Sequence, residues 1–378
     1  MRSANQLAAL CALINNANSI YDAYIPDFER LSTYHGMQAL LYYYLHRQTG
    51  WYTWPDALRE SLSAATHNAH ARALLREREL QKVLDKLAAN GVHPILMKGV
   101  PLGYSHYPSP ALRPCGDTDM LIREQDRAII DLILQQFGYA CARFKAQLIS
   151  YQDSYGRTGK LNMRHELDIH WKISNRQLFS NTLDYASAYA RAIPLPQLSK
   201  HAMALCPVDA LLMACLHRAT HLQDEQEEPD RLIWFYDMHV LVQTMSTGEK
   251  REFLTLAREK KLCAVCTDAL YWTRHYFQTQ GATKLLESLA NSQPNSEPSA
   301  QYFAISNTQA LWLDWRALPD FKSRLKALYS ALFPAPAYMQ QRYGKINPLW
   351  LPYLYPYRWF KACSRLLKNL FQKGRTCL

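Results

Sequence analysis

The stretch from residue 161 to 171 constrains the fold more than any other part of the chain. Apolar side chains, such as Leu167 and Ile169, fall on odd positions, whereas Asp168 and His170 fall on even ones. This alternation with a period of two predicts a β-strand with one apolar and one polar face. The chain should therefore contain a sheet.

Other segments show where this sheet ends and helices begin. The first ninety residues have the apolar spacing of helices, ending at Asn90-Gly91, and residues beyond about 205 are helical again. Between them, residues 92–97 and 118–122 have strand character, and a helix is expected over 124–137. We therefore predict a small sheet domain of mixed strands and helices within a largely helical chain.

Composition and charge narrow the class of protein. A hydrophobic content of 48% in 378 residues supports a large core and excludes a disordered chain. The net charge of +11 favours anionic partners, namely nucleotide phosphates, nucleic acid or an acidic membrane surface. The nine cysteines are scattered and odd in number, which favours reduced thiols and a cytoplasmic protein.

A cluster of acidic residues indicates metal chemistry. Asp117 and Asp119 alternate at the start of an extended segment, so both carboxylates should point to one face. A hard divalent cation such as Mg²⁺ relieves their repulsion. Asp168, with Glu166 beside it, offers a third carboxylate from another strand, as in sites that hold two metal ions. Taken singly, each acid is equally compatible with a solvated strand end.

Three further residues are candidates for holding phosphates. Lys98-Gly99 follows a strand and opens a helix, a position where backbone amides bind phosphate. Arg113 precedes Asp117 by four residues and is expected to neutralise phosphate charge. The alternative interpretation is that Gly99 serves a tight turn, Lys98 ends a strand and Arg113 pairs with a surface acid.

The order of these motifs resembles a known family. Three segments carry the resemblance: Ile95-Leu-Met-Lys-Gly-Val-Pro-Leu-Gly-Tyr, Arg113-Pro-Cys-Gly-Asp-Thr-Asp-Met-Leu-Ile and Leu167-Asp-Ile-His-Trp171. They resemble the uncharacterised nucleotidyltransferase family of the DNA polymerase beta-like superfamily. One departure is the turn, which is Lys-Gly here and usually Gly-Gly or Gly-Ser in the superfamily.

The resemblance implies a fold and a chemistry. The fold would be α+β, a minimal nucleotidyltransferase mixed sheet flanked by helices. Asp117 and Asp119 would bind two Mg²⁺ ions, with Mn²⁺ as a substitute, and Asp168 would bind metal or accept the acceptor's proton. The expected division of the chain is a helical region over 1–90, the nucleotidyltransferase core over 91–195, a helical domain over 196–330, and a Pro/Tyr-rich segment with a basic terminal helix over 331–378.

Five residues are weaker candidates for the site: Glu166 and His170 on the predicted strand, and His217, His221 and Asp237 outside the core. His217 and His221 lie one helical turn apart, but the H-E-x-x-H pattern of zinc hydrolases requires Glu where this chain has Arg218. We expect these histidines on a helix packed against the sheet, near the nucleotide. Asp237 is either a satisfied polar residue of an aromatic helix or a helper at the cleft between domains.

The C-terminus suggests a further partner. Residues 358–375 combine basic side chains with an aromatic-rich stripe and contain no acid. Such a helix is expected to bind an anionic membrane surface at the inner face of the membrane. The alternatives are that it docks on a partner protein or packs on its own domain.

The sequence thus predicts a Mg²⁺-dependent enzyme that transfers a nucleoside monophosphate from an NTP to an unidentified acceptor: a protein, a peptide, a small molecule or RNA. Nucleic acid is not the favoured partner, because no aromatic-interleaved recognition motif is present. Two alternatives are a metal-dependent glycosyltransferase that uses Asp117 and Asp119, and a non-catalytic binding module on the same fold.

Overall fold

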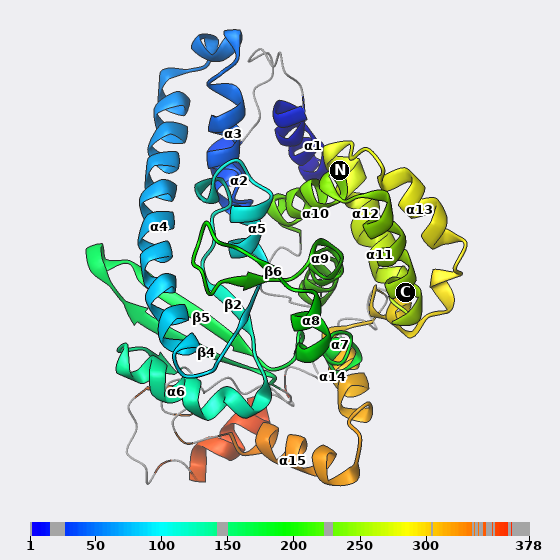
Figure 1. The fold of residues 1–378 in the computed structure, drawn as a ribbon. Coiled ribbons are helices and arrows are strands. Elements are labelled where there is room, and N and C mark those ends of the chain that lie inside the picture. Colours follow the sequence, from blue (N-terminus) through cyan, green and yellow to red (C-terminus); the bar gives the residue numbers. More distant parts are fainter. Residues whose placement is uncertain are drawn as a thin grey trace. The chain divides into compact units, whose positions relative to one another are not determined.

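The computed structural model describes residues 2–15, 27–141, 150–222, 230–303 and 305–334, with shorter stretches between 336 and 364. The chain forms two compact units, one of residues 1–141 and 151–310, the other of 142–150 and 311–378. The predicted α+β class is confirmed, since the described residues contain a mixed sheet among many helices (Figure 1). The four-part division of the chain stays a prediction.

The sheet of the first unit has seven strands among the described residues, in the order β3-β4-β5-β2-β1-β7-β6. The pairs β1–β7 and β2–β5 are parallel, and the other neighbours are antiparallel. The strands are β1 (Ile95–Met97), β2 (Thr118–Leu121), β3 (Ala140–Cys141), β4 (Gln152–Thr158), β5 (Arg164–His170), β6 (Ile193–Pro194) and β7 (Met203–Ala204).

One predicted strand begins later than its alternation suggested. β5 starts at Arg164, because Leu161 and Asn162 adopt φ values of 54° and 57° in a 3₁₀ turn. Leu161, predicted on the apolar face, is 86% exposed. A turn with positive φ leaves the extended conformation, so the alternation of side chains cannot continue through it.

Helices surround the sheet in this unit. The predicted helix over 124–137 is a 3₁₀ turn at Glu124–Asp126 followed by α6, and the helix expected before Asn90-Gly91 is α4. The helices are α1 (Arg2–Asn15), α2 (Phe28–Tyr34), α3 (Gln38–Leu45), α4 (Asp56–Ala88), α5 (Gly99–Ser105), α6 (Arg127–Gln136), α7 (Gln177–Ser180), α8 (Tyr185–Arg191), α9 (Pro207–His221), α10 (Leu232–Thr244), α11 (Thr247–Glu259), α12 (Cys263–Phe277) and α13 (Ala282–Ala290).

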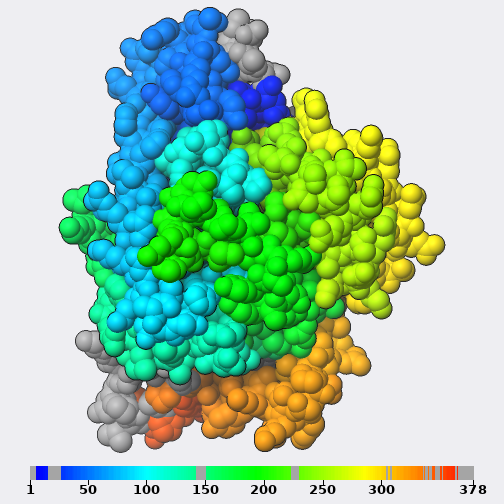
Figure 2. Space-filling model, viewed as in Figure 1, coloured from blue at the N-terminus to red at the C-terminus, as the bar shows by residue number. Residues whose placement is uncertain are grey.

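Alternation along the strands divides the core in two. Leu96 and Met120 belong to a cluster with the C-terminal half of α4 and with α6, whereas Met97 and Leu121 belong to a larger cluster that includes α9, α10 and α12. The sheet is therefore covered on both faces. Part of α4 remains at the surface, as its blue atoms show (Figure 2).

The second unit contains most of α14 (Asn307–Arg316) and all of α15 (Phe321–Leu332). Asp320 caps α15 by accepting a hydrogen bond from the backbone N–H of Ser323. Of the basic helix predicted over 358–375, residues 358–361 and 364 are helical and the others lie outside the described residues. Among the described helices, none has both the length and the apolar character needed to cross a bilayer.

Candidate active site

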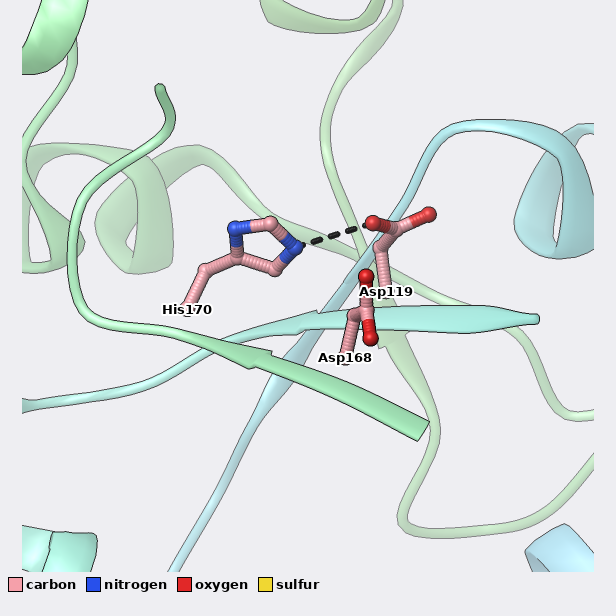
Figure 3. Close-up of side chains that lie close together, drawn as sticks. All are labelled: Asp119, Asp168 and His170. Carbon is pink, nitrogen blue, oxygen red and sulfur yellow. Dashed lines mark hydrogen bonds and ion pairs between the residues drawn. The ribbon is translucent and has the colours of Figure 1, made fainter. Parts of the chain in front are cut away.

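Two aspartates lie opposite each other on neighbouring parallel strands. Asp119 of β2 and Asp168 of β5 are Cα partners in the ladder. Both carboxylates point to the same side of the sheet, and His170 joins them two residues further along β5 (Figure 3). Asp119 has the same parity as Leu121 and therefore faces the core that contains α9 and α10.

Asp119 is held as an anion by two neighbours. Lys98 Nζ donates to Asp119 Oδ1 at 2.5 Å, and His170 Nε2 lies 2.9 Å from the same oxygen. Burial alone would raise the pKa of Asp119, but Lys98 and His170 outweigh it and hold that pKa well below its usual range. The negative charge of Asp119 therefore persists although the side chain is buried.

Asp117 shares this electrostatic environment. It lies in the bend before β2 and is partly buried. Burial and the charge of Asp119 raise the pKa of Asp117, while Lys98 opposes them. Burial lowers the pKa of Lys98, but Asp119, Asp117 and Asp168 together raise it above the usual value. Three carboxylates thus act on one ammonium group, and the excess negative charge is what a divalent cation neutralises.

The geometry supports a metal site at this point. The ligand atoms of Asp119, Asp168 and His170 all lie within 4.8 Å of one another. Carboxylate oxygens suit Mg²⁺ and Mn²⁺, and imidazole is a ligand for softer ions. The donor set therefore fits a divalent cation bound through the two carboxylates. Asp117 was predicted as a ligand and lies outside this trio, whereas His170, a weaker candidate, lies within it.

The Lys98-Gly99 turn brings the ammonium group to this cluster. Lys98 has φ 60° and ψ −135°, which is a strained conformation for a residue with a side chain. Gly99 then begins α5. A Cβ atom on Gly99 would lie 2.6 Å from Arg113 Cζ, far inside van der Waals contact. Glycine at this position therefore leaves room for the Arg113 guanidinium.

Arg113 and Asp237 are both sequence candidates, and the structure pairs them with each other. Arg113 Nε and Nη2 donate to the Asp237 carboxylate at 2.8 and 2.7 Å, and Tyr107 donates to it at 2.6 Å. Arg113 Nη1 donates to the carbonyl of Pro114. All three side chains are buried. Arg113 therefore ties the segment that leads to Asp117 to helix α10.

Comparison with known proteins agrees with this site. A family model described as "Uncharacterised nucleotidyltransferase" matches residues 22–278, a span that includes every residue of the acidic cluster. The chain belongs to this nucleotidyltransferase family. No curated protein matches the sequence significantly.

His217 and His221 lie on helix α9, as expected. Their rings contact each other and Trp234, with centroid distances of 4.5 Å between His217 and His221 and 4.7 Å between His217 and Trp234. Burial, followed by the positive charge of Lys98, lowers the pKa of His217 well below its usual value. His217 is therefore neutral and lies within electrostatic range of the acidic cluster.

The remaining candidate acid, Glu166, lies outside the trio. Glu166 is partly exposed and forms an ion pair with Arg164 on the same strand. It is two residues from Asp168 and shares its strand face, but it is not among the side chains that converge near Asp119. The carboxylate of Glu166 is therefore paired with the solvent-exposed Arg164.

Sequence reasoning missed two residues that orient Asp168. Gln152 of β4 donates from Nε2 to Asp168 Oδ2 at 2.9 Å, and Asn175 Nδ2 donates to Gln152 Oε1 at 3.0 Å. These amides hold the carboxylate from the side away from Asp119. No motif indicates them. The antiparallel register pairs Gln152 of β4 with His170 of β5, which places Gln152 diagonally across from Asp168 on the same face of the sheet.

Proposed function

We propose that this protein catalyses divalent-cation-dependent transfer of a nucleoside monophosphate from an NTP to an acceptor, with release of pyrophosphate. The acceptor's hydroxyl, phosphate or amine would attack the α-phosphorus, and the bond to the β-phosphate oxygen would break. The observation that carries this proposal is the pairing of Asp119 with Asp168 on adjacent strands, beside Lys98, in a member of a nucleotidyltransferase family.

The acidic residues would hold the cation. Asp119 and Asp168 supply oxygen ligands, Asp117 adds a third carboxylate nearby, and His170 orients Asp119. Mg²⁺, or Mn²⁺ in its place, supplies charge neutralisation of the phosphates when bound. The number of ions, two by family analogy, is part of the proposal.

Other residues would position the substrates. Asp168, oriented by Gln152, would accept the proton of the attacking group. The Lys98 ammonium, within reach of Asp119, would neutralise charge on the NTP phosphates. We assign Arg113 a positioning role, because its guanidinium is engaged by Asp237 and by the Pro114 carbonyl. We also propose that the protein is located in the cytoplasm, where NTPs are abundant.

A labelling assay tests this function. The full-length protein is incubated with NTPs labelled at the α-phosphate, Mg²⁺ and a cell lysate, and transfer of label to protein, peptide, small-molecule and RNA fractions is measured. Asp119→Asn and Asp168→Asn should abolish transfer, because each removes a charge of the cation site. Asp153→Asn, which alters an aspartate of β4 paired with Arg127, is the matched control and should retain it.

The assay also separates the alternatives. Undiminished labelling by the Asp119→Asn and Asp168→Asn variants, with normal thermal stability, would contradict the proposal. Nucleotide sugars labelled in the sugar serve as the second substrate class, and transfer from them alone would favour a glycosyltransferase. Absence of Mg²⁺ or Mn²⁺ binding to the folded wild-type protein would favour a binding module.

A further inference from the structure

One side of helix α15 exposes a row of apolar side chains. Phe321, Leu325, Leu328 and Leu332 are spaced four, three and four residues apart, which places them on one helical face. Phe321 is 77% exposed and Leu325 55% exposed. Ala327, on the opposite side, is buried. We call these four residues, with the neighbouring Tyr329, the α15 stripe.

The α15 stripe lies at the start of the most basic part of the chain. Residues 321–378 contain eleven of the 43 Lys and Arg residues and none of the 32 Asp and Glu residues, which leaves 32 of each sign in residues 1–320. The whole net charge of +11 therefore comes from this segment. Asp320, the N-cap of α15, is the last acidic residue.

Basic side chains border the stripe on both edges. At 100° per residue, Lys322 and Lys326 fall on one side of it and Arg324 on the other. An apolar centre with basic edges is the pattern of a helix that lies in the headgroup region of an anionic bilayer. A nucleic-acid interface differs, because there the basic and hydrogen-bonding groups occupy the centre of the contact.

Residues 352–361 form a helical segment that packs at the end of α15 and adds exposed aromatic residues. Arg358 Nη1 donates to the Ala331 carbonyl at 2.5 Å, and Trp359 Nε1 donates to the Leu332 carbonyl at 2.8 Å. Tyr353 and Phe360 of this segment are 70% and 73% exposed. Tyrosine and tryptophan are enriched where proteins meet the membrane–water interface.

We propose that α15 binds the surface of an anionic membrane, with the α15 stripe among the upper acyl chains and Lys322 and Lys326 at the lipid phosphates. The apolar stripe supplies the hydrophobic part of binding, and the basic border supplies the preference for anionic lipid. This inference is independent of the reaction proposed above.

Vesicle flotation with the full-length protein tests it. The protein should float with vesicles of phosphatidylcholine and phosphatidylglycerol, and much less with phosphatidylcholine alone. Leu325→Asp should reduce binding about tenfold or more, because it places a charge in the apolar stripe. The double variant Lys322→Gln and Lys326→Gln should reduce it by about 25-fold, since each basic residue near the surface contributes about a fivefold gain in binding.

Two matched controls make the test specific. Leu132→Asp alters a leucine of α6 that is 61% exposed, and the double variant Lys82→Gln and Lys86→Gln alters exposed lysines four residues apart on α4. Both controls should bind vesicles like the wild type. If the two control variants reduce vesicle binding as much as the two α15 variants do, binding reflects the general charge or apolarity of the protein. That result would overturn the proposal.

Two other outcomes would also overturn it. If Leu325→Asp lowers the thermal midpoint without vesicles and Leu132→Asp does not, the α15 stripe is covered by protein. If the double lysine variant weakens binding to an RNA oligonucleotide and to vesicles alike, while Leu325→Asp changes neither, the segment is a general polyanion binder.

Discussion

The Arg113 guanidinium and the Asp237 carboxylate form a buried two-bond ion pair, at 2.8 Å from Nε and 2.7 Å from Nη2, across 124 positions of sequence. The pair joins the segment before Asp117 to helix α10. Ion pairs of this kind rarely add net stability, but removal of one partner leaves a buried charge without compensation. Loss of either side chain should therefore disturb the approach to the acidic cluster.

Asp237→Asn should lower the free energy of unfolding by about 3–5 kcal/mol, because the Arg113 charge stays buried without its counter-ion. A thermal unfolding scan measures the loss. Glu166→Gln is the control, since it makes the same carboxylate-to-amide change in the exposed pair with Arg164 and should cost less than about 1 kcal/mol. Equal thermal midpoints for the two variants would show that the buried pair is unimportant.

Gly99→Ala should destabilise the protein by about 1–3 kcal/mol, because the added methyl group overlaps the Arg113 guanidinium. The contact would be 2.6 Å from Cβ to Arg113 Cζ. Gly116→Ala is the control, as no atom lies within 4 Å of a Cβ at that position. The midpoints of thermal unfolding of the Gly99→Ala and Gly116→Ala variants measure the difference in stability. The steric argument fails if Gly99→Ala is as stable as Gly116→Ala.

Gln152→Ala should weaken Mg²⁺ or Mn²⁺ binding about 10- to 100-fold, because it frees the carboxylate of Asp168 to rotate. Calorimetric titration of the metal measures the change. Asn181→Ala, which removes an exposed amide that accepts from Lys172, is the control and should leave metal affinity unaltered. Unchanged affinity in Gln152→Ala would mean that this amide does not orient a metal ligand.

Acidification should destabilise the protein through His239. Burial lowers the pKa of His239 from 6.5 to about 4, and its ring Nδ1 lies 2.9 Å from Thr279 Oγ1. Between these pKa values the unfolded chain binds a proton that the folded protein does not, so stability falls as the pH falls below about 6.5. The loss from this site between pH 7 and pH 5 should be about 2 kcal/mol.

The His239→Gln variant tests whether His239 lowers the stability of the protein as the pH falls. It should show a shallower fall of thermal midpoint between pH 7 and pH 5 than the wild type, because the differential proton uptake is removed. The same change at His67, an exposed residue of α4, should leave the wild-type slope. A steeper slope in His239→Gln would show that His239 is charged in the folded protein.

Local patterns predicted the secondary structure around the site well. Strands were predicted within 161–171, 92–97 and 118–122, and residues 164–170, 95–97 and 118–121 of these segments are strands. The helix expected before Asn90-Gly91 is α4. These predictions hold because periodicity records which side of an element is buried. The error at Leu161 arose where a turn interrupts the strand, a feature of backbone conformation that apolar spacing does not encode.

Contacts between distant segments could not be predicted in the same way. Arg113 was assigned to phosphate or to a surface acid, and its partner proved to be the buried Asp237. His170 was only a weaker candidate for the site and was not predicted as a metal ligand, yet its ring lies beside Asp119. Such pairings depend on strand order and helix packing, which bring together residues far apart in sequence.

The sequence by itself determined the kinds of chemical group present, the strand that carries Asp168 and the family to which the chain belongs. Only the tertiary structure decided that β2 and β5 are parallel neighbours in the register that places Asp119 opposite Asp168. The physical reason is that a shift of one residue in that register would turn Asp168 to the other face of the sheet. Burial of Met120 and Ile169 on that other face favours the observed register, and many side chains from distant helices contribute to it.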